Sequence, residues 1–383
     1  FPSLGRQPLE SHFIPVATSE RVYGVSLLEA RRGQPVWQAD LPGDSGLLPQ
    51  IGPYGASFCT IQTRRELTVL DPATGETLWQ RIELPAERGL HGDHAAGLFG
   101  DDEALVLLDA DGVSYTVYKT RTGEEDGRGR LPIDPRRQRR TYGRKLFFVE
   151  TGESRSVARL WDPVTGGDDL ALPFAGRLLQ TSTRDDRLVL LFADGRLLIV
   201  EPRSGETVVD VRLDPAEAAA AHTIQVFSDD ERFYVSLYRA DPGRFEEAKV
   251  AGYVYDTPLT TAHVQGRLLA IDRRTAAVVW SRATEQRSVL DPVEYPLPFL
   301  VATARVSDRR GGNRKTLLVE AIDKRTGATL GRNEALLPDQ LLQVRYGADK
   351  VELAGMTSTV VLEFGPEAQS DAPLVLGLDA AAQ

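Results

Sequence analysis

Two of the five histidines in the chain lie three residues apart, with a carboxylate between them. His91, Asp93 and His94 belong to the segment HGDH, and imidazole and carboxylate groups at this spacing can bind a divalent transition metal. The sequence therefore predicts a candidate metal site at His91, Asp93 and His94. The segment enters a strand region and does not lie on a helix that would fix the spacing, so a solvated or capping loop is the alternative.

No nucleophile or phosphate-binding motif accompanies these residues. The chain lacks G-x-S-x-G and G-x-x-x-x-G-K segments. Its one cysteine, Cys59, excludes an internal disulfide and a thiolate metal cluster, and the strand-like segment ASFCTIQT predicts a buried thiol. The acidic residues Asp101, Asp102 and Glu103 follow a short strand-like segment and favour a solvated hairpin tip over a calcium site. We therefore predict no catalytic residue and no cofactor.

Aromatic residues gather in a segment that predicts contact with a protein partner. Residues 241–265 combine a charged half with an aromatic half that contains Tyr253 and Tyr255, and Phe245 lies in the charged half. Tyr295 lies in the similar segment LDPVEYPLPF. Loops inserted into a repeat often carry binding, and tyrosines are common anchors of protein interfaces. A hairpin that only covers an exposed edge is the alternative.

Composition and charge narrow the class of protein. The 383 residues are 42% hydrophobic and 26% charged, which is typical of a globular protein. The net charge of -10 disfavours nucleic acid as a partner. No apolar run approaches the ~18 residues that a transmembrane helix needs.

The strand segments that must position these residues belong to an internal repeat. The segment LTVLDPATGETLW, residues 67–79, returns in altered form along the whole chain. Its copies are about 40 to 50 residues apart, except for one longer interval that contains residues 241–265. The positions equivalent to its glycine are Gly33, Gly75, Gly123, Gly166, Gly205, Ala276, Gly327 and Glu367.

Each period also contains further short segments rich in Val, Leu, Ile and Tyr and bounded by Gly, Asp or Asn, as strands are. Four antiparallel strands per period predict an all-β fold, a single β-propeller of four-stranded blades over residues 1–383. Eight copies predict eight blades, with seven as the alternative. The first copy is short, and we expect the C-terminal end to supply its missing strand. Helix is expected only at residues 213–222, with Asp214 as the cap.

The repeated segment has a physical reason. An aspartate can accept backbone N–H bonds two residues on, threonine does so more weakly, and glycine supplies the positive φ that closes the hairpin. A tryptophan after the glycine can cover the packing interface between two blades. The residues that we assign to this motif are Trp37, Asp71, Thr74, Gly75, Trp79, Asp162, Gly166, Asp272, Trp280, Asp323 and Gly327.

These copies resemble the PQQ-like, or quinoprotein-type, β-propeller repeat, in which a strand ends in aspartate and Thr-Gly and tryptophan follow. LTVLDPATGETLW matches the pattern fully, whereas LLAIDRRTAAVVW lacks the glycine. The resemblance implies one of two branches. The quinoprotein dehydrogenases bind pyrroloquinoline quinone and calcium and often carry an adjacent cysteine pair, which this chain lacks. The chain is more similar to the non-enzymatic, BamB-like branch.

The resemblance implies a non-enzymatic scaffold with protein partners in a bacterial assembly, in an extracytoplasmic or periplasmic location, although a cytoplasmic one stays open. A quinoprotein-type oxidoreductase with pyrroloquinoline quinone and calcium over the central channel is the first alternative. A lectin-like or metal-binding sensor is the second alternative.

Overall fold

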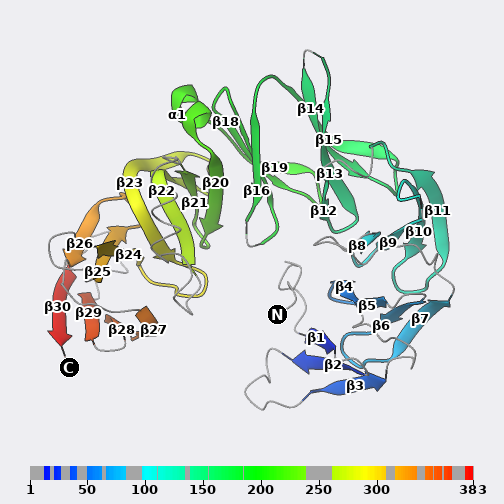
Figure 1. Ribbon diagram of the computed structural model, residues 1–383, viewed down its shortest axis with the longest axis horizontal. Coiled ribbons are helices and arrows are strands. Elements are labelled where there is room, and N and C mark those ends of the chain that lie inside the picture. The colour runs from blue at the N-terminus through cyan, green and yellow to red at the C-terminus, as the bar shows by residue number, and fades with distance from the viewer. Residues whose placement is uncertain are drawn as a thin grey trace. The chain divides into compact units, whose positions relative to one another are not determined.

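A computed structural model describes most of the chain. The described residues are 13–17, 21–26, 35–40, 50–62, 66–82, 97–109, 111–133, 139–153, 155–183, 185–238, 261–307, 315–333, 341–347, 349–355, 358–364 and 376–382. They form strands β1 to β30 and one short helix, α1 (Figure 1). The chain divides into two compact units, which are described separately below.

The first unit comprises residues 1–176, 184–187 and 201–206. It contains one sheet of three strands, β1–β3, and three of four strands, β4–β7, β8–β11 and β12–β15, all antiparallel between neighbours in sequence. The strands are β1 (Phe13–Ala17), β2 (Arg21–Ser26), β3 (Trp37–Asp40), β4 (Gln50–Tyr54), β5 (Cys59–Gln62), β6 (Glu66–Leu70), β7 (Thr77–Ile82), β8 (Leu98–Gly100), β9 (Ala104–Leu108), β10 (Ser114–Lys119), β11 (Glu125–Arg130), β12 (Arg139–Tyr142), β13 (Lys145–Thr151), β14 (Ser156–Asp162) and β15 (Gly167–Phe174).

The second unit comprises residues 177–183, 188–200 and 207–383. It contains sheets β16–β19, β20–β26 and β27–β30, again with antiparallel neighbours. The elements are β16 (Leu178–Ser182), β17 (Leu188–Phe192), β18 (Arg196–Glu201), β19 (Glu206–Arg212), α1 (Pro215–Ala220), β20 (Thr223–Ser228), β21 (Arg232–Tyr238), β22 (Thr261–Asp272), β23 (Val278–Leu290), β24 (Phe299–Ser307), β25 (Lys315–Asp323), β26 (Thr329–Asn333), β27 (Leu341–Tyr346), β28 (Lys350–Gly355), β29 (Ser358–Phe364) and β30 (Leu376–Ala382).

This succession of four-stranded antiparallel sheets, each formed by strands consecutive in sequence, confirms the predicted all-β fold and is that of a β-propeller. The seven-stranded sheet spans two consecutive repeats. The long strand β23 pairs with β22 along most of its length, and its end also pairs with β24, where Ser288 lies opposite Thr303. Because β23 belongs to both repeats, the sheets do not number the blades, and eight blades over one domain, residues 1–383, stay a prediction.

The C-terminal strand differs from the prediction. β30 pairs with β29 from Ser358 opposite Ala382 to Phe364 opposite Leu376, and it forms the edge of the last sheet. The sequence predicted that the C-terminal end would complete the first sheet, and that prediction was wrong. The reason is that β30 provides the fourth strand of its own repeat.

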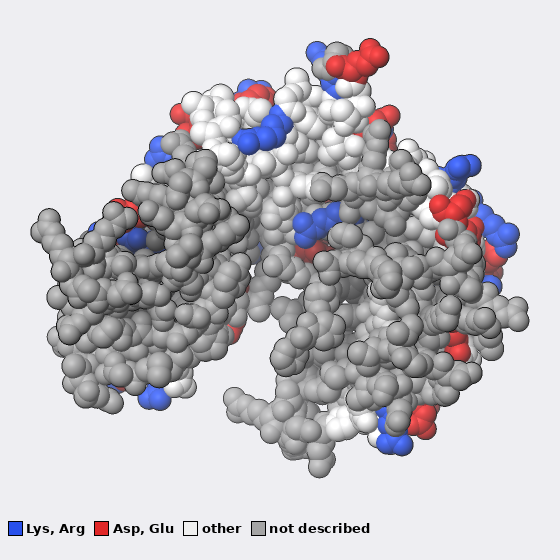
Figure 2. Space-filling model, in the orientation of Figure 1, with Lys and Arg blue, Asp and Glu red and all other residues white. Residues whose placement is uncertain are grey.

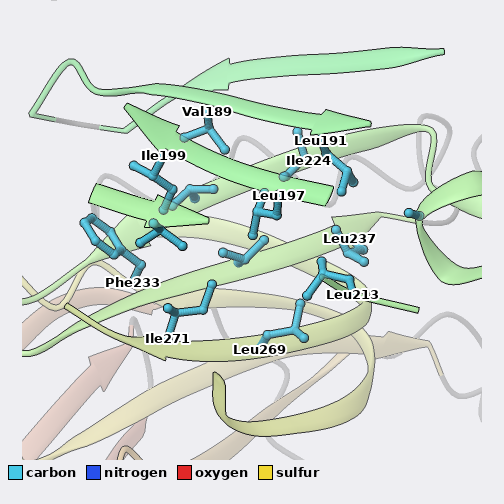
Figure 3. Close-up of a cluster of buried hydrophobic side chains, with 14 of the residues drawn as sticks. Val189, Leu191, Leu197, Ile199, Leu213, Ile224, Phe233, Leu237, Leu269 and Ile271 are labelled. Atoms are coloured by element: carbon cyan, nitrogen blue, oxygen red, sulfur yellow. The ribbon is translucent and has the colours of Figure 1, made fainter. Parts of the chain in front are cut away.

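The core lies between the faces of neighbouring sheets. In the second unit, Val189 and Leu191 of β17 and Leu197 and Ile199 of β18 pack with apolar residues of β20, β21 and β22, as Figure 3 shows. All five residues of β17 are buried. Strands covered on both faces have no polar side, which explains why the inner strands read as continuous apolar runs in the sequence.

The one helix was predicted. In α1, Asp214 caps the first turn by accepting the N–H of Ala216 at 2.8 Å, and Pro215 takes the first helical position. The helix connects β19 to β20, and its residue Ala218 is buried in the core between these sheets.

Candidate functional site

Tight turns join the last two strands of six copies of the repeat, and four of them begin with an aspartate of the motif. These six segments, residues 71–75, 119–123, 162–166, 201–205, 272–276 and 323–327, are called the anchor turns. In each, the N–H of the last residue donates to the carbonyl of the first at 2.8 to 2.9 Å. Where the turn begins with aspartate, the carboxylate adds a second bond: the N–H of Ala73 donates to Asp71 at 2.8 Å, and that of Arg325 to Asp323 at 2.7 Å. These carboxylates are therefore engaged in local structure.

The last position of the anchor turn lies in the left-handed region of backbone space. Gly75, Gly166 and Gly327 have φ of 74°, 69° and 70°. Ala276 takes the same conformation with φ of 56°, although its side chain disfavours it. The turn geometry is thus maintained where the sequence motif loses its glycine.

Tryptophans link three of the anchor turns to the preceding copy of the repeat. The packing interface between two consecutive copies is called a seam. The indole N–H of Trp37 donates to the carbonyl of Pro72 at 2.7 Å, that of Trp79 to Thr120 at 2.7 Å and that of Trp280 to Lys324 at 2.8 Å. In all three seams the acceptor is the second residue of the next anchor turn, so the contact is a property of the repeat.

The same rings cover the glycines of these turns. A Cβ added at Gly75 would lie 2.5 Å from the ring of Trp37, and one added at Gly123 would lie 2.6 Å from the ring of Trp79. Nothing lies within 4 Å of the corresponding point at Gly166. Glycine is thus favoured for its backbone at the anchor turns, where Ala276 is the one exception, and it also leaves the space that a packed tryptophan needs.

Arginines two residues after two of these tryptophans extend the seam contact. Arg81 donates to the carbonyl of Gly123 at 3.3 Å and lies over the ring of Tyr118 at 4.2 Å. Arg282 donates to the carbonyl of Gly327 at 2.9 Å. The sequence analysis did not identify these arginines, but the shared spacing in WQR and WSR carries the signal.

One seam without a tryptophan uses a tyrosine for the same bond. Tyr115 donates its hydroxyl to the carbonyl of Pro163 at 3.1 Å, the second residue of the next anchor turn. The fourth tryptophan, Trp161, packs edge-on against Tyr115, with ring centroids 5.8 Å apart. Tyr115 lies on β10 and not after the glycine, so the motif spacing does not reveal it.

The acidic residues 101–103 link neighbouring sheets and do not form a solvated tip. Asp102 accepts the N–H of Ser57 at 2.7 Å and its hydroxyl at 2.8 Å, which joins the sheets β8–β11 and β4–β7. Asp101 accepts the N–H of Glu103 at 3.0 Å and pairs with Arg144 at 3.5 Å. Arg144 also pairs with the anchor-turn residue Asp162 at 3.2 Å, so these carboxylates stabilise the seam.

Several predicted site residues lie outside the described residues. They are His91, Asp93 and His94 of the metal hypothesis and Phe245, Tyr253 and Tyr255 of the interaction hypothesis. Of residues 241–265, the structure describes 261–265, which begin β22. Within the described part of the chain, no group of three or more His, Cys, Asp or Glu side chains could hold a metal ion.

Tyr295 follows a turn opened by Asp291. Its N–H donates to the carbonyl of Asp291 at 2.9 Å, as in the anchor turns, and its ring packs against the core of the last sheets. The side chain is half-buried, and its hydroxyl donates to Glu294 at 3.3 Å. A contact of Tyr295 with a partner would therefore use only part of the ring.

Cys59 is buried in β5, as expected, with 1% of its surface exposed. Burial raises the pKa of the Cys59 thiol to about 12. The thiol therefore stays protonated near neutral pH and is a poor nucleophile.

Charges on the described surface are mixed. On the face in Figure 2, Lys and Arg side chains lie next to Asp and Glu side chains. Several pair across neighbouring strands, such as Arg196 with Asp210 at 2.7 Å. None of the described helical residues forms a segment long and apolar enough to cross a membrane.

Comparisons with known proteins agree with this architecture. The family model described as outer membrane protein assembly factor BamB matches residues 23–286, more than half of the chain. None of the curated proteins matches the sequence.

Among solved structures, BamB from Moraxella catarrhalis is similar at 14% identity, with 91% of this chain and 90% of that chain covered and a TM-score of 0.36. Quinohemoprotein alcohol dehydrogenase from Comamonas testosteroni is similar at 13% identity, with 92% and 69% covered and a TM-score of 0.35. Scores this low do not discriminate between the two, so the assignment rests on the family match and the strand order.

Proposed function

We propose that this chain, which belongs to the outer membrane protein assembly factor BamB family, is a non-enzymatic binding scaffold in a bacterial assembly outside the cytoplasm. The family match over residues 23–286 is the observation that carries the proposal. The partner is a protein, and the proposal includes no cofactor.

The contacts of the described polar residues support this function. The carboxylates of the anchor turns bind backbone N–H groups, and Asp101, Asp102 and Arg144 join neighbouring sheets. Groups engaged in this way hold neighbouring sheets together and are not set out around a reacting atom. A rigid frame that presents loops is suited to binding.

Affinity capture tests the proposal. The tagged protein is expressed in its native source, cross-linked mildly and purified, and the copurifying proteins are identified. We expect the same protein partner in independent preparations and its loss when the cross-linker is omitted under stringent washing. Recovery of no reproducible partner would contradict a scaffold function.

A second experiment addresses the enzymatic alternative. The purified chain is incubated with pyrroloquinoline quinone and calcium, and dye-linked oxidation of alcohols and sugars is followed. We expect neither saturable binding of the quinone nor dye reduction above that of the free quinone with calcium. Saturable binding accompanied by oxidation would replace the scaffold by a quinoprotein oxidoreductase.

A further inference from the structure

We draw no further inference here: the strongest candidate, the surface patch between Gly127 of β11 and Gly166 of the anchor turn 162–166, where three other seams carry a tryptophan, consists of small residues, and nothing in the described part of the chain shows what covers it.

Discussion

The indole N–H of Trp280 donates to the carbonyl of Lys324 at 2.8 Å, and the ring covers Gly327 in the same anchor turn, one copy of the repeat further along the chain. Because Trp280 is only 8% exposed, the carbonyl has little access to water if the indole is removed. A seam tryptophan therefore stabilises the fold both by burying its ring and by satisfying a backbone acceptor.

Replacing Trp280 by phenylalanine tests the hydrogen bond separately from the ring. Trp280→Phe keeps most of the apolar contact but leaves the Lys324 carbonyl unpaired, so we expect the free energy of unfolding to fall by about 1 to 3 kcal/mol. Trp161→Phe is the control, since no hydrogen bond of the Trp161 indole is found among the described residues. Urea denaturation measures both, and an equal loss in the two variants would contradict the role of the bond.

Two glycines in equivalent turns separate backbone strain from steric contact. Gly166 and Gly327 have φ of 69° and 70°, but only Gly327 lies under a tryptophan ring. Alanine at either position adopts a left-handed conformation at a cost of about 1 to 2 kcal/mol. Gly327→Ala also places a Cβ 2.6 Å from the Trp280 ring, so we expect it to lose at least about 1 kcal/mol more than Gly166→Ala in urea denaturation.

The sequence allowed prediction of the parts that repeat within one copy. The first and last residues of the anchor turns, most often Asp and Gly, have a fixed spacing, and the strand-like segments between the turns indicated four strands per copy. Contacts that depend on which strands pair were not predictable. The sharing of β23 between two repeats and the pairing of β30 with β29 are long-range relationships, which local composition does not encode.

The sequence also did not reveal side chains that make a contact between sheets from a position outside the motif. Tyr115 supplies the seam bond that a tryptophan supplies elsewhere, but it lies on β10, before the anchor turn of its own copy. Asp102 looked like part of a solvated acidic run, because its partner Ser57 is 45 residues away in the sequence. In both cases the acceptor or donor becomes visible only when neighbouring sheets pack.

Asp186 should make stability depend on pH. Its backbone is left-handed, with φ of 65°, and burial raises the pKa of its carboxyl to about 6, against the opposing effect of Arg140 and Arg203. Asp185 and Glu201 raise it further. The folded state therefore holds the proton more tightly than the unfolded state, so the free energy of unfolding should fall as pH rises from about 4 to 6 and then level off.

Asp186→Asn removes this titration and keeps a residue that tolerates the left-handed conformation. We expect the variant to be about 1 to 2 kcal/mol more stable than the unmodified protein at pH 7.5, less than the full shift implies because the group is partly exposed, and nearly equal to it at pH 4. Urea denaturation at the two pH values measures the difference. Asp185→Asn in the same turn is the comparison: it removes only one of the smaller contributions to the raised pKa of Asp186, so its gain should be smaller, and an equal gain would contradict the assignment to Asp186.

Arg282 should contribute more to the free energy of unfolding than an arginine in an exposed ion pair does. It pairs with Glu320 at 2.8 Å, and the Glu320 side chain is only 7% exposed. Arg282 also donates to the carbonyl of Gly327. Arg282→Met leaves a buried carboxylate with less compensation, although Arg287 lies 3.8 Å from it, so we expect a loss of about 3 kcal/mol in the free energy of unfolding.

The matched control is Arg196→Met, since Arg196 and Asp210 form a pair in which both side chains are well exposed, at 38% and 48%. Such pairs contribute about 0.2 to 1 kcal/mol, so this variant should change little. If the loss in Arg282→Met comes from the buried Glu320 carboxylate that has lost its partner, adding Glu320→Gln should recover part of the loss. The reason is that a neutral amide is easier to bury than a carboxylate. Additive losses in the double variant would show that the two side chains act independently and would contradict the ion pair as the cause.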